Sequence, residues 1–184
     1  MKAVKFKTLL RFVYSAIVCI FTNNSSVNAQ SQAPQPHEVV SGNTRSVKVY
    51  DINNFAQFLS PVDDTVYVFN FWATWCEPCL KELPYFDRLA GYFKNKKIKT
   101  IFVSMDFRSK IKELLIPYIE ANNIHSDVIV LNASDTKLLN SKVDSAWSGA
   151  LPATLILKGN QKSFYTKSFT ELELQKVMIN FMLK

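Results

Sequence analysis

The sequence changes from a strand pattern to a helix pattern across residues 71–79, Phe71-Trp72-Ala73-Thr74-Trp75-Cys76-Glu77-Pro78-Cys79. The apolar run at 65–72 has the continuous pattern of a strand that is covered on both faces. From Leu80 to Phe93, apolar side chains recur at three- and four-residue intervals, which is helical spacing. Two cysteines separated by two residues are therefore expected where a buried strand ends and a helix begins.

This position favours thiol chemistry. The start of a helix leaves backbone N–H groups without partners and carries the positive end of the helix dipole. Both stabilise a thiolate, so we expect the pKa of Cys76 to lie below its ordinary value of about 8.5. Residues three apart share a helical face, so Cys79 can attack a mixed disulfide that Cys76 has formed. The spacing predicts an attacking and a resolving cysteine.

The two residues between the cysteines are expected to tune this chemistry. Pro78 suits the first helical turn, because the N–H that it lacks would have no helical partner there. Glu77 should oppose ionisation of Cys76, although an exposed charge is largely screened. This charge favours a reductant over an oxidant, and Glu77→Gln is predicted to make the pair more oxidising.

Two other uses of a close cysteine pair are a structural disulfide and a metal site. A structural disulfide usually closes a longer loop, since a cross-link over four residues constrains the unfolded chain very little. A zinc site needs four ligands, and His37 and His125 are the only histidines of the chain. We therefore expect redox exchange, with no metal and no cofactor other than a Cys76–Cys79 disulfide.

The first residues have the layout of an export signal. Four basic residues within positions 2–11 precede an apolar run at 12–21, and positions 27–29 are Val-Asn-Ala. This order is typical of a secretory signal, so residues 1–29 are interpreted as a signal peptide cleaved after Ala29. The alternative is an uncleaved membrane anchor, but the run is half of the roughly 20 apolar residues that a membrane span needs. An exported cysteine pair meets an oxidising compartment.

The remaining composition fits one domain. The chain has 184 residues, of which 48% are hydrophobic and 13% aromatic, enough for one core and too few for two. Residues 30–44 are polar and are expected to form a flexible linker before a domain at 45–184. Loss of the signal removes four basic and no acidic residues, which lowers the formal charge from +7 to +3. No basic patch with interleaved aromatics remains to suggest nucleic acid.

Strands and helices alternate along residues 45–184. Thr170 with Glu173 predicts a capping box for a last helix, and Asp51 or Asn53 is expected to cap the first. Pro84 is expected to kink the long helix. Continuous strands between helices indicate the α/β class. The expected strands are 46–50, 65–72, 98–105, 127–131, 153–158 and 163–168, and the expected earlier helices are 53–59, 77–93, 109–122 and 135–142.

Residues 71–79 resemble the active-site segment of thioredoxin-like proteins of the TlpA/ResA type, which are exported bacterial reductases. The resemblance covers about residues 45–184, because residues 149–154, Gly-Ala-Leu-Pro-Ala-Thr, stand where this family keeps a cis-proline loop. It implies a thioredoxin-like fold: a central mixed β-sheet flanked by helices, with a helix–strand insertion after the third strand, between Met105 and Asp135. It also implies a cis peptide at Leu151–Pro152 that faces the cysteines; the alternative is a plain proline at a strand start.

The sequence departs from the family pattern at two positions. Asn70 stands where cytoplasmic thioredoxins have a buried aspartate, so the proton acceptor is not identified. Leu151 is bulkier than the threonine or valine usual before the cis-proline, although its backbone is still expected to bind substrate. Trp75 is expected at the substrate-facing rim, whereas Trp72 is expected in packing.

The sequence thus predicts a thiol–disulfide oxidoreductase, monomeric, that reduces protein disulfides in the periplasm or cell envelope. The resemblance implies a membrane electron donor of DsbD type and, as in some relatives, a role in cytochrome c maturation. An oxidant that introduces disulfides would use the same residues. A copper-delivery module is disfavoured because such carriers have a three-residue gap and a remote histidine, and a peroxidase because it needs a lone cysteine three after Thr or Ser.

Overall fold

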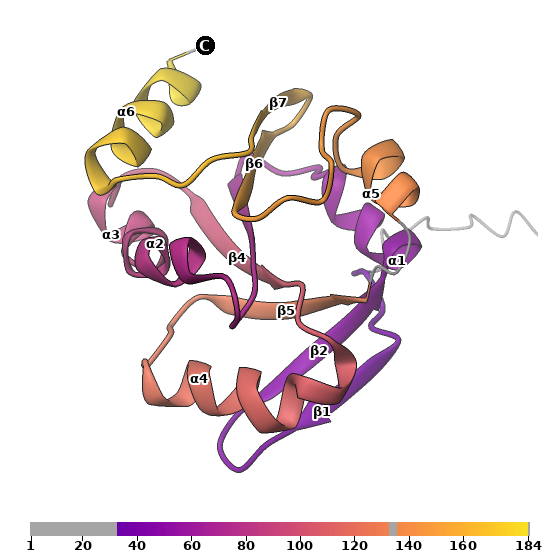
Figure 1. Cartoon of the computed structure of the whole chain (residues 1–184). Helices are drawn as coiled ribbons and strands as arrows, with labels where there is room; N and C mark the ends of the chain where they lie inside the picture. The colour runs from indigo at the N-terminus through magenta and orange to yellow at the C-terminus, as the bar shows by residue number, and fades with distance from the viewer. Residues whose placement is uncertain (1–32, 133–135, 184) are drawn as a thin grey trace, which may run out of the picture. The chain divides into compact units, whose positions relative to one another are not determined.

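The computed structural model describes residues 33–132 and 136–183 of the protein. These residues form a seven-stranded sheet with helices on both faces (Figure 1). The predicted signal peptide lies outside the described residues. The strands are β1 (Glu38–Ser41), β2 (Ser46–Asp51), β3 (Val66–Trp72), β4 (Ile98–Ser104), β5 (Asp127–Asn132), β6 (Ala153–Lys158) and β7 (Gln161–Tyr165). The α-helices are α1 (Ile52–Ala56), α2 (Glu77–Asp87), α3 (Leu89–Tyr92), α4 (Ile116–Ala121), α5 (Thr136–Lys142) and α6 (Glu171–Met182).

The strand order is β1-β2-β5-β4-β3-β6-β7. The four strands β2, β5, β4 and β3 run parallel, and β1, β6 and β7 are antiparallel to their neighbours. The predicted mixed sheet of a thioredoxin-like α/β fold is therefore confirmed. Because β3 and β4 are parallel, the segments that follow their carboxyl ends leave the sheet at the same edge. The cysteine segment and residues 105–107 are these two segments.

Each face of the sheet buries its own hydrophobic cluster, since successive side chains of a strand point to opposite faces. One cluster joins the sheet to α2, α3, α4 and α6 and contains Cys76 and Cys79. The other joins it to α1 and α5 and contains Trp147. On β3, Val68 belongs to the first cluster and Phe69 to the second. Figure 1 shows α1 and α5 on one side of the sheet and α2, α3 and α6 on the other.

The predicted flexible linker at 30–44 is wrong from Glu38 onward. Residues 38–41 form β1, which pairs antiparallel with β2 and places Val40 opposite Val47. The strand escapes the sequence pattern because it lies at the edge of the sheet and buries one side chain, that of Val40. The polar residues around it face solvent, as edge strands require. The folded domain therefore begins before the predicted boundary at residue 45.

Two predicted helices are interrupted in the structure. The expected helix at 77–93 consists of α2 and α3, which are separated by Arg88. The expected helix at 109–122 consists of a 3₁₀ turn (Arg108–Lys110), a π-helical turn (Ile111–Leu115) and α4. Pro117 lies in the first turn of α4, where a proline is tolerated. The π-helical turn precedes this proline and replaces the regular helix that the spacing predicts.

The predicted helix caps are confirmed. Asp51 is the N-cap of α1, and its Oδ1 accepts the backbone N–H groups of Asn53 and Asn54, both at 2.9 Å. Thr170 and Glu173 form a complete capping box at the start of α6. The side chain of each residue binds the backbone N–H of the other, at 3.3 Å and 2.9 Å.

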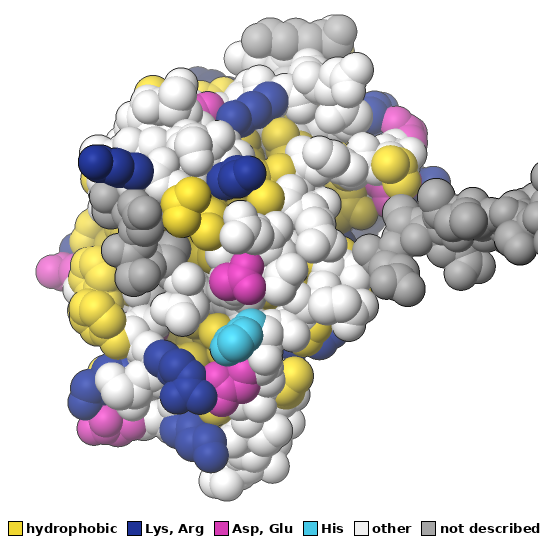
Figure 2. Space-filling view, turned by 90° about the vertical axis from the view of Figure 1, so that its right-hand side faces the viewer, with side chains coloured by type: hydrophobic (Ala, Val, Ile, Leu, Met, Phe, Trp, Pro, Cys, Tyr) yellow, Lys and Arg dark blue, Asp and Glu magenta, His cyan; other side chains and the backbone are white. Residues whose placement is uncertain are grey.

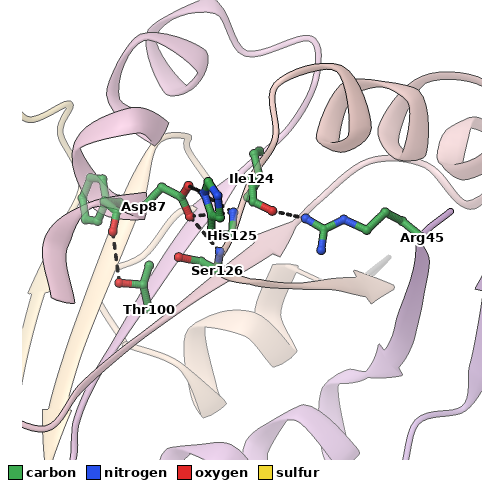
Figure 3. Close-up of polar contacts among 7 residues, drawn as sticks. Arg45, Asp87, Thr100, Ile124, His125 and Ser126 are labelled. Atoms are coloured by element: carbon green, nitrogen blue, oxygen red, sulfur yellow. Dashed lines mark hydrogen bonds and ion pairs between the residues drawn. The ribbon is translucent and has the colours of Figure 1, made fainter. Parts of the chain in front are cut away.

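The predicted insertion comprises the helical segment at 108–121 and β5, which lies between β2 and β4. Asp87, the last residue of α2, accepts the backbone N–H of Ser126 at 2.7 Å and that of His125 at 3.1 Å (Figure 3). Burial alone would raise the pKa of Asp87, but these hydrogen bonds outweigh burial and hold the pKa below its ordinary value. The C-terminal end of α2 is therefore hydrogen-bonded to the segment that leads into β5.

The surface carries charges of both signs. Figure 2 shows basic and acidic side chains among hydrophobic ones on the face that lies to the right in Figure 1. Ion pairs at 3.0 Å link Lys158 to Asp64 and Lys162 to Asp144. Exposed pairs of this kind contribute little to stability. They balance the charge locally.

Candidate functional site

Cys76 and Cys79 form a disulfide at the start of α2, with their Cα atoms 5.3 Å apart. Cys76 is the N-cap of the helix, and its side chain makes no capping hydrogen bond. The first N–H groups of α2 therefore receive no partner from the side chain at the N-cap, and they remain available to stabilise negative charge on sulfur. Pro78 lies in the first turn, where its missing N–H removes no helical bond.

The two cysteines differ in accessibility. Cys79 is fully buried, whereas Cys76 keeps 5% of its surface exposed. Both belong to the hydrophobic cluster on the α2 face of the sheet. A partner that reaches this disulfide from solvent therefore meets Cys76 first, which agrees with the expected order of attack.

Glu77 is exposed and pairs with Lys81, one helical turn later, at 2.8 Å. The hydrogen bond and charge of Lys81 hold the pKa of Glu77 below its ordinary value. The carboxylate is thus ionised at neutral pH, but part of its field at Cys76 is cancelled by the ammonium group. The structure therefore weakens the predicted influence of Glu77 on the thiolate.

The cis peptide expected at Leu151–Pro152 is present. The pairing of β3 with β6 sets Phe71 opposite Ala153, so Pro152 precedes β6 beside the end of β3 that leads to the cysteines. Pro152 is buried, and Leu151 is partly exposed and packs against the cluster that contains both cysteines. The structure thus brings this loop and the disulfide to the same edge of the sheet.

Trp147, which the sequence analysis did not single out, holds this loop in place. Its indole N–H donates to the carbonyl oxygen of Ala150 at 2.9 Å. Its ring is fully buried and lies 4.6 Å from the ring of Phe71 on β3, between centroids. A tryptophan six residues before a strand carries no pattern that predicts this contact. It fixes the residue before Leu151 to the strand that leads to the cysteines.

Glu82 is a further residue that the sequence analysis missed. It lies on α2 three residues after Cys79, so both share a helical face, and only 1% of it is exposed. Its carboxylate accepts hydrogen bonds from Asn70 Nδ2 at 2.9 Å, from Ser168 Oγ at 3.1 Å and from the backbone N–H of Phe169 at 2.6 Å. Burial raises its pKa more than these three donors lower it. The signal available in the sequence is a glutamate at an apolar position of the helical pattern.

Asn70 stands where cytoplasmic thioredoxins have a buried aspartate. It therefore faces a buried carboxylate that Glu82 supplies from α2 instead. Its Nδ2 donates to Glu82 and to Thr154 Oγ1, the latter at 3.3 Å, while its buried Oδ1 has no partner. An amide can turn over and present its oxygen instead. Asn70 can thus donate to an ionised Glu82 or accept from a protonated one.

Trp75 and Trp72 differ in exposure as the sequence predicts for a rim and a packing residue, and the substrate-facing role of Trp75 stays a prediction. Trp75 is 61% exposed at the rim beside the disulfide, and Trp72 is fully buried. Trp72 packs against Phe102 of β4 and Tyr118 of α4, with ring centroids 6.4 Å and 5.5 Å apart. Trp72 therefore joins β3 to the insertion, and Trp75 lies open to solvent.

Within residues 33–132 and 136–183, no group of three or more His, Cys, Asp or Glu side chains is placed to hold a metal ion. His125, one of the two candidate zinc ligands, instead has its Nδ1 3.1 Å from Asp87 Oδ2. None of the helices in the described part of the chain is both long and apolar enough to span a membrane.

The sheet order, the disulfide at the start of α2 and the cis-proline loop define a protein of the thioredoxin-like class. The model of the AhpC/TSA family matches residues 47–166. The chain belongs to the AhpC/TSA family.

The curated relatives include proteins named thiol-disulfide oxidoreductase ResA. The one from Bacillus subtilis strain 168 is 28% identical over 92 residues, which cover 50% of this chain and 45% of the relative. The one from Oceanobacillus iheyensis is 42% identical over 48 residues, or 26% of this chain and 25% of the relative. These matches span less than half of either relative. A third, from Geobacillus kaustophilus, is 24% identical over 165 residues and 83% of its length. The resemblance to ResA-type proteins is confirmed.

Solved structures share the fold. A DsbF homologue from Corynebacterium diphtheriae has a TM-score of 0.54 and 18% identity, over 79% of this chain and 85% of the other. A thioredoxin-family thiol:disulfide interchange protein from Chlorobium tepidum TLS has a TM-score of 0.54 and 16% identity, over 80% and 95%. These likenesses support the thioredoxin-like architecture.

Proposed function

We propose that this protein is a thiol–disulfide oxidoreductase that reduces disulfides of other proteins through Cys76 and Cys79. One observation carries the proposal: the disulfide lies at a helix start whose N-cap side chain makes no hydrogen bond, at the same edge of the sheet as a cis-proline loop. A purely structural cross-link would need neither feature. The ResA relatives support this reading by their name.

The reaction begins with the reduced pair. The thiolate of Cys76 attacks one sulfur of a substrate disulfide, a mixed disulfide forms, and the other substrate sulfur leaves as a thiolate that takes a proton. Cys79 then loses its proton and attacks the sulfur of Cys76, which releases the second substrate thiolate. In total two electrons pass from the cysteine pair to the substrate, its two thiolates take up one proton from solvent and one from the acceptor of the Cys79 proton, and the Cys76–Cys79 disulfide remains.

Glu82 is the group best placed to receive the proton of Cys79. Cys79 is buried, so water cannot take this proton directly, and Glu82 is a buried carboxylate on the same helical face. Its raised pKa brings it closer to that of a thiol than an exposed carboxylate would be. Asn70 can stabilise either protonation state of Glu82 by turning its amide.

The loop before β6 supplies the substrate contact. We propose that the backbone of Leu151 binds an extended substrate segment beside Pro152, with Trp75 at the opposite rim. Pro78 fixes the first turn of α2 between the cysteines, and Glu77 with Lys81 sets the local charge. The bulk of Leu151 restricts what can lie next to the disulfide.

The cellular setting is part of the proposal. Export through a cleaved signal at residues 1–29 would place a monomeric domain in the periplasm or cell envelope, where the oxidised pair needs an electron donor. A membrane protein of DsbD type would supply those electrons, and apocytochrome c is the substrate class that this setting suggests.

Insulin reduction and a measured reduction potential test the function. We expect the wild type to catalyse insulin reduction with dithiothreitol and to have a potential below the about −120 mV of a strong oxidant such as DsbA. Cys79→Ser should accumulate mixed disulfides with insulin, while Cys76→Ser should form none. A potential near −120 mV would instead identify an oxidant, and peroxide turnover without insulin reduction would identify a peroxidase.

A further inference from the structure

Three aromatic side chains are exposed in the described part of the chain, namely Trp75, Tyr92 and Phe107. Tyr92 is accounted for, because its hydroxyl group binds Arg88 and Glu171. Trp75 and Phe107 are 61% and 72% exposed and belong to neither hydrophobic cluster. An exposed aromatic is common on its own, but two on neighbouring segments at a reactive site indicate a binding surface.

The two segments that carry these aromatics are joined by a buried carboxylate. Asp106 is 4% exposed and accepts hydrogen bonds from the backbone N–H of Thr74 at 3.1 Å and from its hydroxyl at 2.6 Å. Ser104 Oγ donates to the same carboxylate at 2.9 Å. The Thr74 residue precedes Trp75, and Asp106 precedes Phe107. The carboxylate therefore ties the residue before Trp75 to the residue before Phe107, on the segment that continues into Cys76.

The charges that flank this pair of aromatics are already paired within the chain. Glu77 binds Lys81 at 2.8 Å. Arg108, next to Phe107, binds both carboxylate oxygens of Glu38, at 2.7 Å and 2.8 Å. A partner thus meets exposed apolar surface between ion pairs whose charges already balance. Such a surface favours an apolar side chain of the partner over a charged one.

We propose that Phe107 is a specificity-determining residue for disulfide exchange. With Trp75 it binds a large apolar side chain next to the reacting cysteine of an extended, uncharged polypeptide segment. Thr74 and Asp106 act as positioning residues, because they hold the two aromatics without touching the substrate. This inference rests on the proposed function and adds the substrate class to it.

Two disulfide-linked peptides test the proposal. Each is an uncharged homodimer, Gly-Phe-Cys-Gly or Gly-Gly-Cys-Gly, blocked at both ends, and kcat/KM for its reduction is measured with the full chain. We expect the wild type to prefer the Phe peptide by about tenfold, the scale of one apolar contact in a binding site. Phe107→Ala should remove most of this preference, and Leu172→Ala, which alters an exposed leucine on α6, should retain it.

The positioning role of the hydrogen bond between Thr74 and Asp106 is tested by substitution of Thr74. Thr74→Val removes the hydroxyl bond to Asp106 while keeping the side chain's shape, and we expect it to lower the preference for the Phe peptide; Thr74→Ser should restore it. Equal preference in wild type and Phe107→Ala would overturn the specificity role. A wild type that reduces both peptides at the same rate would also overturn it, whereas a wild type that reduces neither peptide nor insulin would overturn the proposed function itself.

Discussion

Helices α2 and α6 begin in opposite ways. At α6, Thr170 and Glu173 satisfy each other's backbone N–H groups in a capping box. At α2 the N-cap is Cys76, which makes no such bond. Both helices pack on the same face of the sheet. The difference shows that the chain has good capping residues available and uses one at the start of α6, while it leaves donors without a side-chain cap at the helix start that carries the cysteine pair.

The largest expected effect follows from replacing Cys76, the N-cap residue of α2, with a residue whose side-chain oxygen can accept a capping hydrogen bond. Cys76→Ser should abolish disulfide exchange, because a hydroxyl group does not replace the thiolate. Compared with Cys76→Ala, which also lacks the disulfide, it should be more stable by about 1 kcal/mol, since serine caps a helix well. Insulin reduction and urea unfolding measure the two quantities. Equal stability of the two variants would show that α2 has no open donors for its N-cap.

Glu82→Gln should slow the release of the mixed disulfide at neutral pH by about 10²-fold, the usual scale of a lost general base. Stopped-flow measurement of the resolving step tests this. The glutamine can be accommodated, because Asn70 can turn its free Oδ1 toward the new amide. Initial attack by Cys76 should change much less. A resolving rate like that of the wild type would exclude Glu82 as the proton acceptor.

The same residue should make stability depend on pH. Because the folded-state pKa of Glu82 lies above the unfolded value, its stabilising contribution is complete below the unfolded pKa and is lost as pH rises through the folded one. The free energy of unfolding should therefore fall with rising pH in this window more steeply in the wild type than in Glu82→Gln. Parallel curves from urea unfolding at several pH values would contradict this.

At α6, Thr170→Ala should destabilise the domain by about 1 kcal/mol through loss of the cap, and Thr170→Ser should not. The reduction potential should be the same in both variants and the wild type, because this cap lies outside the redox site. A shifted potential in Thr170→Ala would show that the two helix starts are coupled.

Glu173 makes the stabilising effect of the same cap depend on pH in the acid range. Hydrogen bonds from Thr170, aided by Lys167, lower its pKa from 4.5 to about 2. A depressed pKa contributes stability above the unfolded value and loses it as pH falls through the folded one, here between about 4.5 and 2. Unfolding followed by circular dichroism should show a shallower acid dependence in Glu173→Gln. An unchanged dependence would mean that the cap is not formed in solution.

The smallest effect is expected for Glu77→Gln. The lost charge should make the pair more oxidising, but Lys81 already cancels part of it, so the shift in potential should be a few millivolts to about 15 mV, or half of the 30 mV that corresponds to a tenfold change. Lys81→Gln should move the potential in the opposite direction. Equal shifts in the same direction would contradict an electrostatic origin.

Local patterns predicted much of this fold. Continuous apolar runs indicated β3, β4, β5 and β6 because these strands are covered on both faces, and Thr170 with Glu173 indicated the start of α6 from three-residue spacing alone. The cis peptide at Leu151–Pro152 followed from family resemblance. What could be predicted depended either on periodicity or on a recognisable motif.

The rest depends on contacts between residues distant in sequence. Glu82 meets Asn70 and Phe169, and Asp106 meets Thr74, only after the sheet has assembled. Strand β1 buries a single apolar side chain, so its pattern is that of a linker. Such features carry no local period, and a sequence shows them only as polar residues in unexpected places.

The position of β5 constrains how this architecture can be altered. Because β5 hydrogen-bonds to β2 on one side and β4 on the other, its removal would divide the sheet into two parts with two newly unpaired edges. The segment that distinguishes this chain from a minimal thioredoxin thus contributes an interior strand of the sheet and is required for the sheet to be continuous. Trimming it would not yield a smaller intact domain, and substitutions meant to alter the surface of this segment are better made in its helical part than in its strand.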